Sequence, residues 1–528
     1  LFKFNFQIMK KLKSVFLLGA LAIGLGLTSC SSDDGLANSQ TSAEKGSTYA
    51  SLSISFPTSS STRALPDDYN SDGTWTGRDE IKSVSVFLYN STLNTVDYSK
   101  FSASSFTGID ANGKLTPNIA VKATPGQNVK AYVVINDVNN DVTKTLENAA
   151  KTPNTFDAAF AAEVNTVANQ VSAYNTADSK DVILMTNDVT PTATVIAPNI
   201  TQQEAINGPT NLIPVKVQRV VSRAIVTMDK NIKKTIQLYD ASGNAASIIT
   251  IKDLKYGVGQ SGQSFFNLQH TDFSTPSAIY SGDATIGATA MDNTGLNSFT
   301  EVTSIDDNTN TSITGALNAE TTGSKFVLPV THAPNGYFKG NTTYFEIRAT
   351  FTPDKVDGNP YNPGTDVYLG QNDGLFYSTR ALAEASGQKS TCYKGDGNTT
   401  NGGAITKYIL WLNPDVVPGT GGTTKASMSP TVRNQVYNVY ISGFKTIGIP
   451  NNPLNPGSPT YPTQPVGPEN PIDPNNPLNP ADPNDPNNPD NPIKPTDPLE
   501  TQDTYLSVTI TVLPYTVHSY GISIGNDY

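Results

Sequence analysis

The segment LSVTITVLP, residues 506–514, sets the kind of fold that the chain needs. Its apolar and small polar side chains alternate, so an extended chain here has one apolar and one polar face. This period and the β-branched content predict a strand that buries one face in a sheet. The apolar face consists of Leu506, Val508, Ile510 and Val512. The sequence leaves open whether this strand folds back onto its own domain or joins another molecule.

A second segment, SLSISFP at residues 51–57, has the same alternation and the same final proline. The two segments are therefore expected to fit equivalent edges of a sheet. A polar run, TSSSTR, follows and ends at Arg63, the first arginine of the chain. Exposed polar loops are preferred sites of proteolysis. The apolar face of this early strand consists of Leu52, Ile54 and Phe56.

The first thirty residues are predicted to be an export signal. Met9 begins a short basic region, and an apolar stretch from Val15 to Leu27 is too short for a comfortable transmembrane helix. The sequence LTSC at 27–30 is typical of a bacterial lipobox, in which the cysteine is acylated and becomes the new N-terminus. We therefore expect a lipoprotein with its lipid on Cys30 and a true start at Met9.

The body of the chain is predicted to be mainly β. Short strands alternate with Asn, Asp, Gly and Pro turns, which favours two β-sandwich domains in tandem, of the transthyretin-like, Greek-key type, with a few short helices. An alanine-rich stretch at 143–174 predicts helices divided by Pro153. A second run of strands starts near residue 213, where we place the boundary between the domains.

A proline-rich segment separates the body from the final strand. Prolines occur at every third position from Pro450 to Pro498. Polyproline II has three residues per turn, so the prolines form one edge of an extended rod that reaches roughly 150 Å at about 3.1 Å per residue. Such a segment cannot bury a core, and we expect it to be a tether.

The composition excludes several functions. The 528 residues have a formal net charge of −11 and no cluster of basic residues, so nucleic acid is not an expected partner. The two cysteines, Cys30 and Cys392, cannot form a disulfide framework, and no C-x-x-C zinc pattern is present. The three histidines are far apart in sequence and there is no nucleophile elbow. We expect neither an enzyme nor a cofactor, apart from the covalent lipid.

Two local motifs compete with simpler interpretations. The residues 257–262, GVGQSG, match a dinucleotide-binding fingerprint, but no helical period follows them, so a glycine-rich hairpin turn is preferred. The segment 68–79 has oxygen side chains and a glycine at calcium-loop positions, with no flanking helices. We therefore expect no metal there. The candidate calcium ligands are Asp68, Asn70, Asp72 and Asp79.

The chain resembles the fimbrillins of type V pili, in particular the shaft subunits of short (minor) fimbriae. The resemblance covers nearly the whole chain, in the order of the family. It departs from close relatives at Tyr515, where they have Trp, and in the eight residues after Tyr520. The segments that carry it are LTSC (27–30), SLSISFPTSSSTRA (51–64), VQRVVSRAIVTM (217–228), KFVLPVTH (325–332), GNTTYFEIRATFTP (340–353), WLNP (411–414) and DTYLSVTITVLPYTVHSY (503–520).

The resemblance implies a mechanism of assembly. Family members are exported as outer-membrane lipoproteins, and an arginine-specific surface protease cuts in the loop after the first strand. For this chain the cut would fall between Arg63 and Ala64. Loss of the first strand opens a groove that the C-terminal strand of another copy fills. Accessory anchor and tip proteins, and host or bacterial surface ligands, are the other implied partners.

On this basis the chain divides into six parts. The parts are a signal peptide at 1–29, a lipidated propeptide with a removable strand at 30–63, an N-terminal β-sandwich at 64–213, a C-terminal β-sandwich at 214–449, the tether at 450–498 and the donor-strand region at 499–528.

The main alternative function is a glycan-binding surface lipoprotein. The 23 tyrosines could form stacking platforms for sugars, although there are only two tryptophans, Trp75 and Trp411.

Overall fold

The structure is a computed structural model. Cys30, Arg63, Ala64, three of the four candidate calcium ligands and the proline-rich tether after Pro450 lie outside the residues that it describes. The described residues are 44–56, 75, 77–109, 114–276, 291–320, 325–332, 340–412, 431–450 and 506–514.

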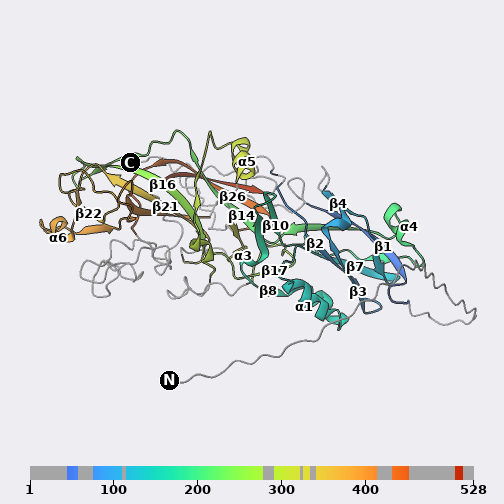
Figure 1. The fold of residues 1–528 in the computed structure, drawn as a ribbon. Helices are drawn as coiled ribbons and strands as arrows, with labels where there is room; N and C mark the ends of the chain where they lie inside the picture. The colour runs from blue at the N-terminus through green and yellow to red at the C-terminus, as the bar shows by residue number, and fades with distance from the viewer. Residues whose placement is uncertain are drawn as a thin grey trace, which may run out of the picture. The chain divides into compact units, whose positions relative to one another are not determined.

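The predicted mainly β fold with a few short helices is confirmed (Figure 1). The first strand-rich region forms one large sheet in the order β3-β2-β7-β11-β13-β1-β5-β4, with β12 attached to β7 and β6 to β1. Among its described pairs, only β1 and β13 run parallel. The strands are β1 (Thr48–Ser55), β2 (Ser83–Asn90), β3 (Thr95–Ser102), β4 (Phe106–Ile109), β5 (Lys114–Pro117), β6 (Val121–Ala123), β7 (Gly126–Ile135), β11 (Met185–Asn187), β12 (Thr194–Ile196) and β13 (Leu212–Arg219).

The second strand-rich region forms two larger sheets and one small one. One sheet has the order β19-β14-β26-β27 with β20 attached to β14, and the other has the order β15-β16-β21-β25 with β18 attached to β16. These strands are β14 (Ser222–Asp229), β15 (Thr235–Tyr239), β16 (Ala245–Gly259), β18 (Thr300–Glu301), β19 (Thr303–Ile305), β20 (Lys325–Val327), β21 (Tyr344–Pro353), β25 (Ala404–Trp411), β26 (Gln435–Phe444) and β27 (Leu506–Pro514).

Three smaller sheets complete the described strands. The three-stranded one has the order β23-β22-β24, and the two others are the pairs β9-β10 and β8-β17. Their strands are β8 (Glu163–Asn165), β9 (Ser172–Asn175), β10 (Lys180–Ile183), β17 (Ser264–Phe266), β22 (Val367–Gly370), β23 (Phe376–Tyr377) and β24 (Ser390–Tyr393).

The helices are short. Pro153 separates α1 from α2, as predicted, and begins a 3₁₀ turn, Pro153–Thr155. The helical prediction for 143–174 is confirmed only in part beyond α2. Residues 168–171 are helical, but β8 pairs with β17 and β9 with β10, so sheet pairing prevails there over local helix propensity. The α-helices are α1 (Asp141–Ala149), α2 (Phe156–Ala161), α3 (Ala168–Val171), α4 (Gln202–Asn207), α5 (Asn310–Ala319) and α6 (Arg380–Ala383), and the other 3₁₀ turns are Ala103–Ser105 and Thr294–Asn297.

Three large apolar clusters fill the body. The first core consists of side chains from the strands of the large first sheet. Another core lies between the two larger sheets of the second region. A middle core draws on both regions, and it takes Phe87 from β2, Ile225 from β14 and Val436 from β26, together with residues of α1, α2, α3 and α5. Strands such as β2 are therefore buried on both faces, which explains their nearly continuous apolar sequence.

The chain passes from the first region to the second immediately after β13. Residues 212–216 of β13 pair with β1 and residues 217–219 pair with β11, so all of β13 belongs to the first sheet. The boundary predicted between residues 213 and 214 falls inside this strand, and the change of sheet comes at Val220 and Val221, both fully buried. The domain limits themselves remain a prediction.

The glycine motif at 257–262 is the end of strand β16 and the connection that follows it, not a hairpin turn. β16 ends at Gly259, and β17 pairs with β8 instead of returning along β16. A side chain at Gly259 would lie 2.5 Å from Cζ of the buried Tyr344 ring, and one at Gly262 would lie 2.8 Å from the carbonyl oxygen of Pro329. These glycines allow close packing. The expected hairpin is wrong because the chain leaves the sheet here to join β8.

We predict that Gly259→Ala destabilises the protein by about 1–3 kcal/mol, since the methyl group overpacks the contact with Tyr344. Gly315→Ala is the control, because a methyl group there meets open space inside α5 and should stabilise the helix by roughly 0.5–1 kcal/mol. Urea unfolding of the two variants measures the difference. Equal midpoints would contradict the packing explanation.

Candidate functional site

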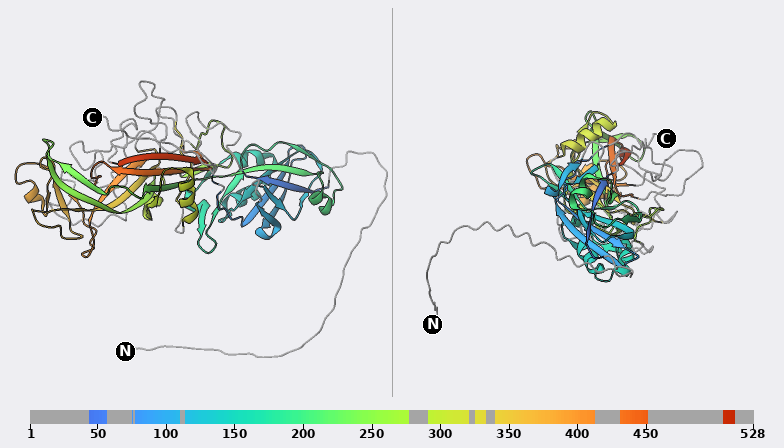
Figure 2. Two further views of the ribbon diagram at one scale, coloured as in Figure 1. Left: turned by 90° about the horizontal axis from the view of Figure 1, so that it is seen from above. Right: turned by 90° about the vertical axis from the view of Figure 1, so that its right-hand side faces the viewer.

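The early strand β1 is an interior strand of the first sheet. Ser51–Ser55 pair in parallel with Leu212–Lys216 of β13, and the opposite edge pairs antiparallel with β5 and β6. The views in Figure 2 show β1, in blue, lying among the other strands of this sheet. Neighbouring strands therefore pair with β1 on both of its edges, at Ser51–Ser55 on one and at Thr48–Ala50 and Ile54–Ser55 on the other.

The apolar face assigned to this strand from sequence is its buried face. Leu52, Ile54 and Phe56 are 2%, 0% and 9% exposed and belong to the first core. The other face contains Ser53 and Ser55, which are partly exposed. β1 thus supplies one wall of the core in addition to its hydrogen bonds.

Polar contacts fix the entry to β1. The amide of Gly46 donates to Oγ1 of Thr124 at 3.1 Å, and Thr124 donates in turn through its amide and hydroxyl to the Asp97 carboxylate. Burial raises the pKa of the Asp97 carboxyl, and the hydrogen bonds from Thr124 act in the opposite direction. Nearby, Thr48 donates through Oγ1 to the carbonyl oxygen of Ala197 at 3.0 Å.

The C-terminal strand β27 lies along β26 of the same chain, antiparallel, from the pair Gln435–Pro514 to the pair Phe444–Leu506. The register shifts between Ile441 and Gly443. Figure 2 shows β27, in red, beside β26. In this chain the two segments of matching pattern therefore occupy different sheets, and β27 has the fold-back arrangement that the sequence left open.

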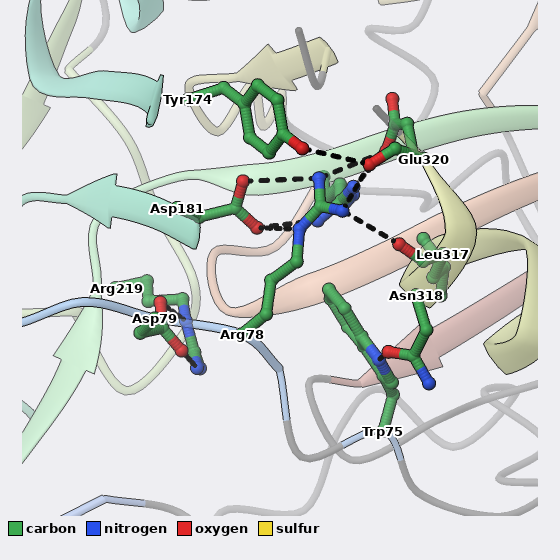
Figure 3. Close-up of polar contacts among 10 residues, drawn as sticks. Trp75, Arg78, Asp79, Tyr174, Asp181, Arg219, Leu317, Asn318 and Glu320 are labelled. Atoms are coloured by element: carbon green, nitrogen blue, oxygen red, sulfur yellow. Dashed lines mark hydrogen bonds and ion pairs between the residues drawn. The ribbon is translucent and has the colours of Figure 1, made fainter. Parts of the chain in front are cut away.

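A buried ionic cluster holds the segment just beyond the predicted cleavage loop (Figure 3). Arg78 donates through Nε to the Asp181 carboxylate at 3.1 Å and through Nη1 to the carbonyl oxygen of Glu320 at 2.7 Å. Arg223 donates to Asp181 at 2.7 Å and also to the Glu320 carboxylate. Asp181 and Arg223 are fully buried. We call Arg78, Asp181, Arg223 and Glu320 the arginine cluster.

Further contacts surround the arginine cluster. Trp75 donates through Nε1 to Oδ1 of Asn318 at 2.8 Å, and its ring lies 4.8 Å from the Arg223 guanidinium carbon. The backbone of residues 78–80 also bonds to the backbone of Asp181. Sequence analysis did not find this site. Its signal was present in VQRVVSRAIVTM, where two arginines interrupt an apolar run.

Asp79, the last candidate calcium ligand, has a different partner in the structure. Nε of Arg219 donates to its carboxylate at 2.9 Å, and Nη2 of Arg219 forms an ion pair with it. The other three candidates lie outside the described residues. Within the described ranges, no three His, Cys, Asp or Glu side chains come together as metal ligands. Among the described helices none is long and apolar enough to cross a membrane.

Comparison with known proteins gives the class of the molecule. Residues 50–239 match the family model of the major fimbrial subunit protein FimA, and residues 400–521 match that of the major fimbrial subunit protein type IV, fimbrillin, C-terminal. Two sequences of the minor fimbrium subunit Mfa1 of Porphyromonas gingivalis are 32% and 31% identical to this chain, over 97% of it and 99% of each relative.

A crystal structure of a fimbrillin, FimA from Porphyromonas gingivalis W83, is 15% identical and covers 89% of this chain and 99% of its own, with a TM-score of 0.38. At that score the likeness adds nothing to the assignment, which rests on the sequence relatives. The molecule is a structural subunit of a cell-surface fimbrium, not an enzyme. The chain belongs to the fimbrillin family, and the relatives above are minor fimbrium subunits.

We predict that Asp181→Asn lowers the free energy of unfolding by about 3–5 kcal/mol, because it leaves two buried arginines without their shared carboxylate. Glu301→Gln is the matched control. The Lys255–Glu301 pair is 46% and 70% exposed, so its loss should change stability by less than about 1 kcal/mol. Chemical denaturation measures both variants, and a loss at Asp181 as small as that at Glu301 would contradict the role given to the arginine cluster.

Proposed function

We propose that this chain is the structural shaft subunit of a surface fimbria. It is exported to the outer membrane as a lipoprotein on Cys30, cut after Arg63 by an arginine-specific protease, and polymerised. In the polymer, the C-terminal strand of one copy fills the place of β1 in another. Accessory anchor and tip fimbrial proteins complete the filament, which supports adhesion to host or bacterial surfaces.

The observation that carries the proposal is the position of β1 as an interior strand. If β1 leaves after the cut, the backbone groups of Leu212–Lys216 lose their partners on one side, and those of β5 and β6 lose theirs on the other. Unpaired backbone groups in a groove are a template for an incoming strand. The fold of the remaining body therefore specifies an extended peptide as the ligand.

The side chains that β1 removes define what the incoming strand must supply. Burial of Leu52, Ile54 and Phe56 contributes about 1.5–3 kcal/mol each, so their loss costs on the order of 5–9 kcal/mol. Residues 506–514 bring four apolar side chains on one face, with a comparable total. Ladder hydrogen bonds involve only the main chain, so they are the same for either strand.

The place of β27 in the uncleaved chain is compatible with a change of partner. Among the described strands it pairs only with β26, at the end of its sheet. An edge strand has one row of ladder bonds to break, whereas an interior strand has two. In the proposal, pairing with β26 is a resting arrangement, and insertion beside β13 of another copy is the assembled one.

We predict that protein extracted from the cell surface begins at Ala64, and that Arg63→Ala leaves a longer, lipidated precursor with few filaments. The reason is that β1 cannot leave the sheet while it is covalently joined to the body. N-terminal sequencing and negative-stain microscopy measure the two effects. Filaments of normal length and number from Arg63→Ala cells would contradict the cleavage step.

We also predict that Val508→Asp abolishes filaments. A carboxylate on the apolar face must enter the groove without a partner, which costs several kcal/mol and offsets much of the burial of the strand. Thr509→Asp is the control, because alternation puts Thr509 on the opposite face, and filaments should persist. Electron microscopy of purified subunits reads out assembly.

Filaments formed by Val508→Asp subunits would contradict the proposed insertion of the C-terminal strand. The melting temperature of the uncleaved Val508→Asp precursor reports separately on the β26–β27 pairing, since Val508 is opposite Ile441 in that register. A large fall in melting temperature with normal filaments would show that fold-back is the principal role of the strand.

A further inference from the structure

The two basic residue types are used differently in this chain. Of its 35 lysines and arginines, only seven are arginines. Six of the seven lie in the described residues, and of these six, four are buried and two, Arg348 and Arg380, are only partly exposed. Arginine is usually a surface residue and is rarely buried unless it is paired. The low exposure of all six side chains is therefore unusual for arginine.

Three of the six lie where the two strand-rich regions meet. The side chains of Arg78, Arg219 and Arg223 are 7%, 5% and 0% exposed. Arg78 and Arg223 belong to the arginine cluster, and Arg219 binds the carboxylate of Asp79 and donates to Oδ1 of Asn434 at 2.8 Å.

The other three are held at separate places in the second region. Arg433 is 5% exposed and donates to the backbone carbonyl oxygens of Phe266 and Asn267. The side chain of Arg348 is 15% exposed, donates to Glu346 at 3.0 Å and lies 4.0 Å from the centre of the Phe299 ring.

Arg380 is the last of these three. Its side chain is 13% exposed, and Nη1 lies 3.5 Å from Oε1 of Glu384. The guanidinium carbon also lies 5.9 Å from the centre of the Tyr368 ring. Each of the six guanidinium groups thus has contacts of its own with the body.

Lysine carries the accessible positive charge instead. Most described lysines are exposed. Among those in ion pairs, the side chains of Lys82, Lys230 and Lys255 are 47%, 52% and 46% accessible. An exposed lysine has the same charge as an exposed arginine. It lacks the planar guanidinium that an arginine-specific binding pocket recognises. A protease that accepts arginine and rejects lysine would therefore find few accessible sites on this surface.

We propose that the folded body resists arginine-specific proteolysis because each of its six described arginine side chains is withdrawn into contacts of its own. This inference rests on the proposed function, in which such a protease matures the chain. Cleavage needs the arginine side chain in the specificity pocket of the protease and an extended backbone around it. A guanidinium that is buried, or largely buried and held by contacts with the body, meets that need only after local opening of the fold, which occurs in a small fraction of molecules.

The purified full-length precursor, in mild detergent, is incubated with an arginine-specific endoprotease, and the fragments are mapped by mass spectrometry. We expect a cut after Arg63 and, at each of the six described arginines, cleavage at least about 100-fold slower. The heat-unfolded chain should be cut after all seven, which shows that each bond is a substrate once exposed.

Two surface variants test whether burial of the side chain is the cause. Lys233 is an exposed residue between β14 and β15, and Lys389 is an exposed residue between α6 and β24. Lys233→Arg and Lys389→Arg keep the charge and should fold normally. We expect each to create a new, fast cut at the substituted position in the folded precursor.

Rapid cleavage after any of the six arginines in the folded wild-type chain would overturn the inference. So would two surface variants that are as resistant as the wild type, because the backbone rather than arginine burial would then be protective. An intact body together with an uncut Arg63 would support the protection of the body and contradict the proposed maturation.

Discussion

The first sheet is built around a strand, β1, that is paired on both of its edges. β13 lies on one edge of β1, β5 and β6 lie on the other, and the apolar face of β1 closes the first core. An interior strand cannot leave without exposing two rows of backbone groups and the side chains beneath it. The body therefore needs some strand at this position. An external strand can satisfy that need because main-chain hydrogen bonds do not depend on sequence.

The arginine cluster gives the segment after the predicted cleavage loop a different attachment from that of β1. β1 is held mainly by backbone ladders and apolar packing, whereas Trp75, Arg78 and Asp79 are held by side-chain contacts to both strand-rich regions. Charged, multiply bonded contacts in a buried setting are costly to break one partner at a time. If the chain were cut between these two segments, the second would stay attached through its buried ionic contacts. The first would be held by its strand pairing, its apolar packing and the polar contacts at Gly46 and Thr48.

Arginine suits this position for a physical reason that lysine does not share. Its planar guanidinium has five donors, so Arg78 can bond at once to the Asp181 carboxylate and to the carbonyl oxygens of Leu317 and Glu320. The guanidinium carbon also lies 4.7 Å from the centre of the Tyr174 ring, a contact that favours a weakly hydrated cation. The same contacts that join the two regions withdraw the side chain from solvent.

By itself, the sequence determined the features that depend on local period and local chemistry. The alternation in 51–57 and 506–514 predicted two strands, and the buried face of β1 is the predicted one, because side chains of a strand alternate whatever its neighbours are. Pro153 divides two helices because its ring and missing amide interrupt any helix at that point. The segments that resemble the fimbrillins, which occur along nearly the whole chain, were likewise recognisable from the sequence.

Which distant segments meet could be learned only from the folded molecule. The partner of each strand, the place of β13 within the first sheet and the strand at 163–165 depend on pairings between residues far apart in the chain, which local propensity does not encode. The partners of Arg78, Asp79 and Arg223 are equally non-local, and oxygen spacing that resembled a calcium loop concealed the pairing of Asp79 with Arg219. The alternation of side chains along a strand follows from backbone geometry alone. Which strands pair depends on how the whole chain buries its apolar side chains.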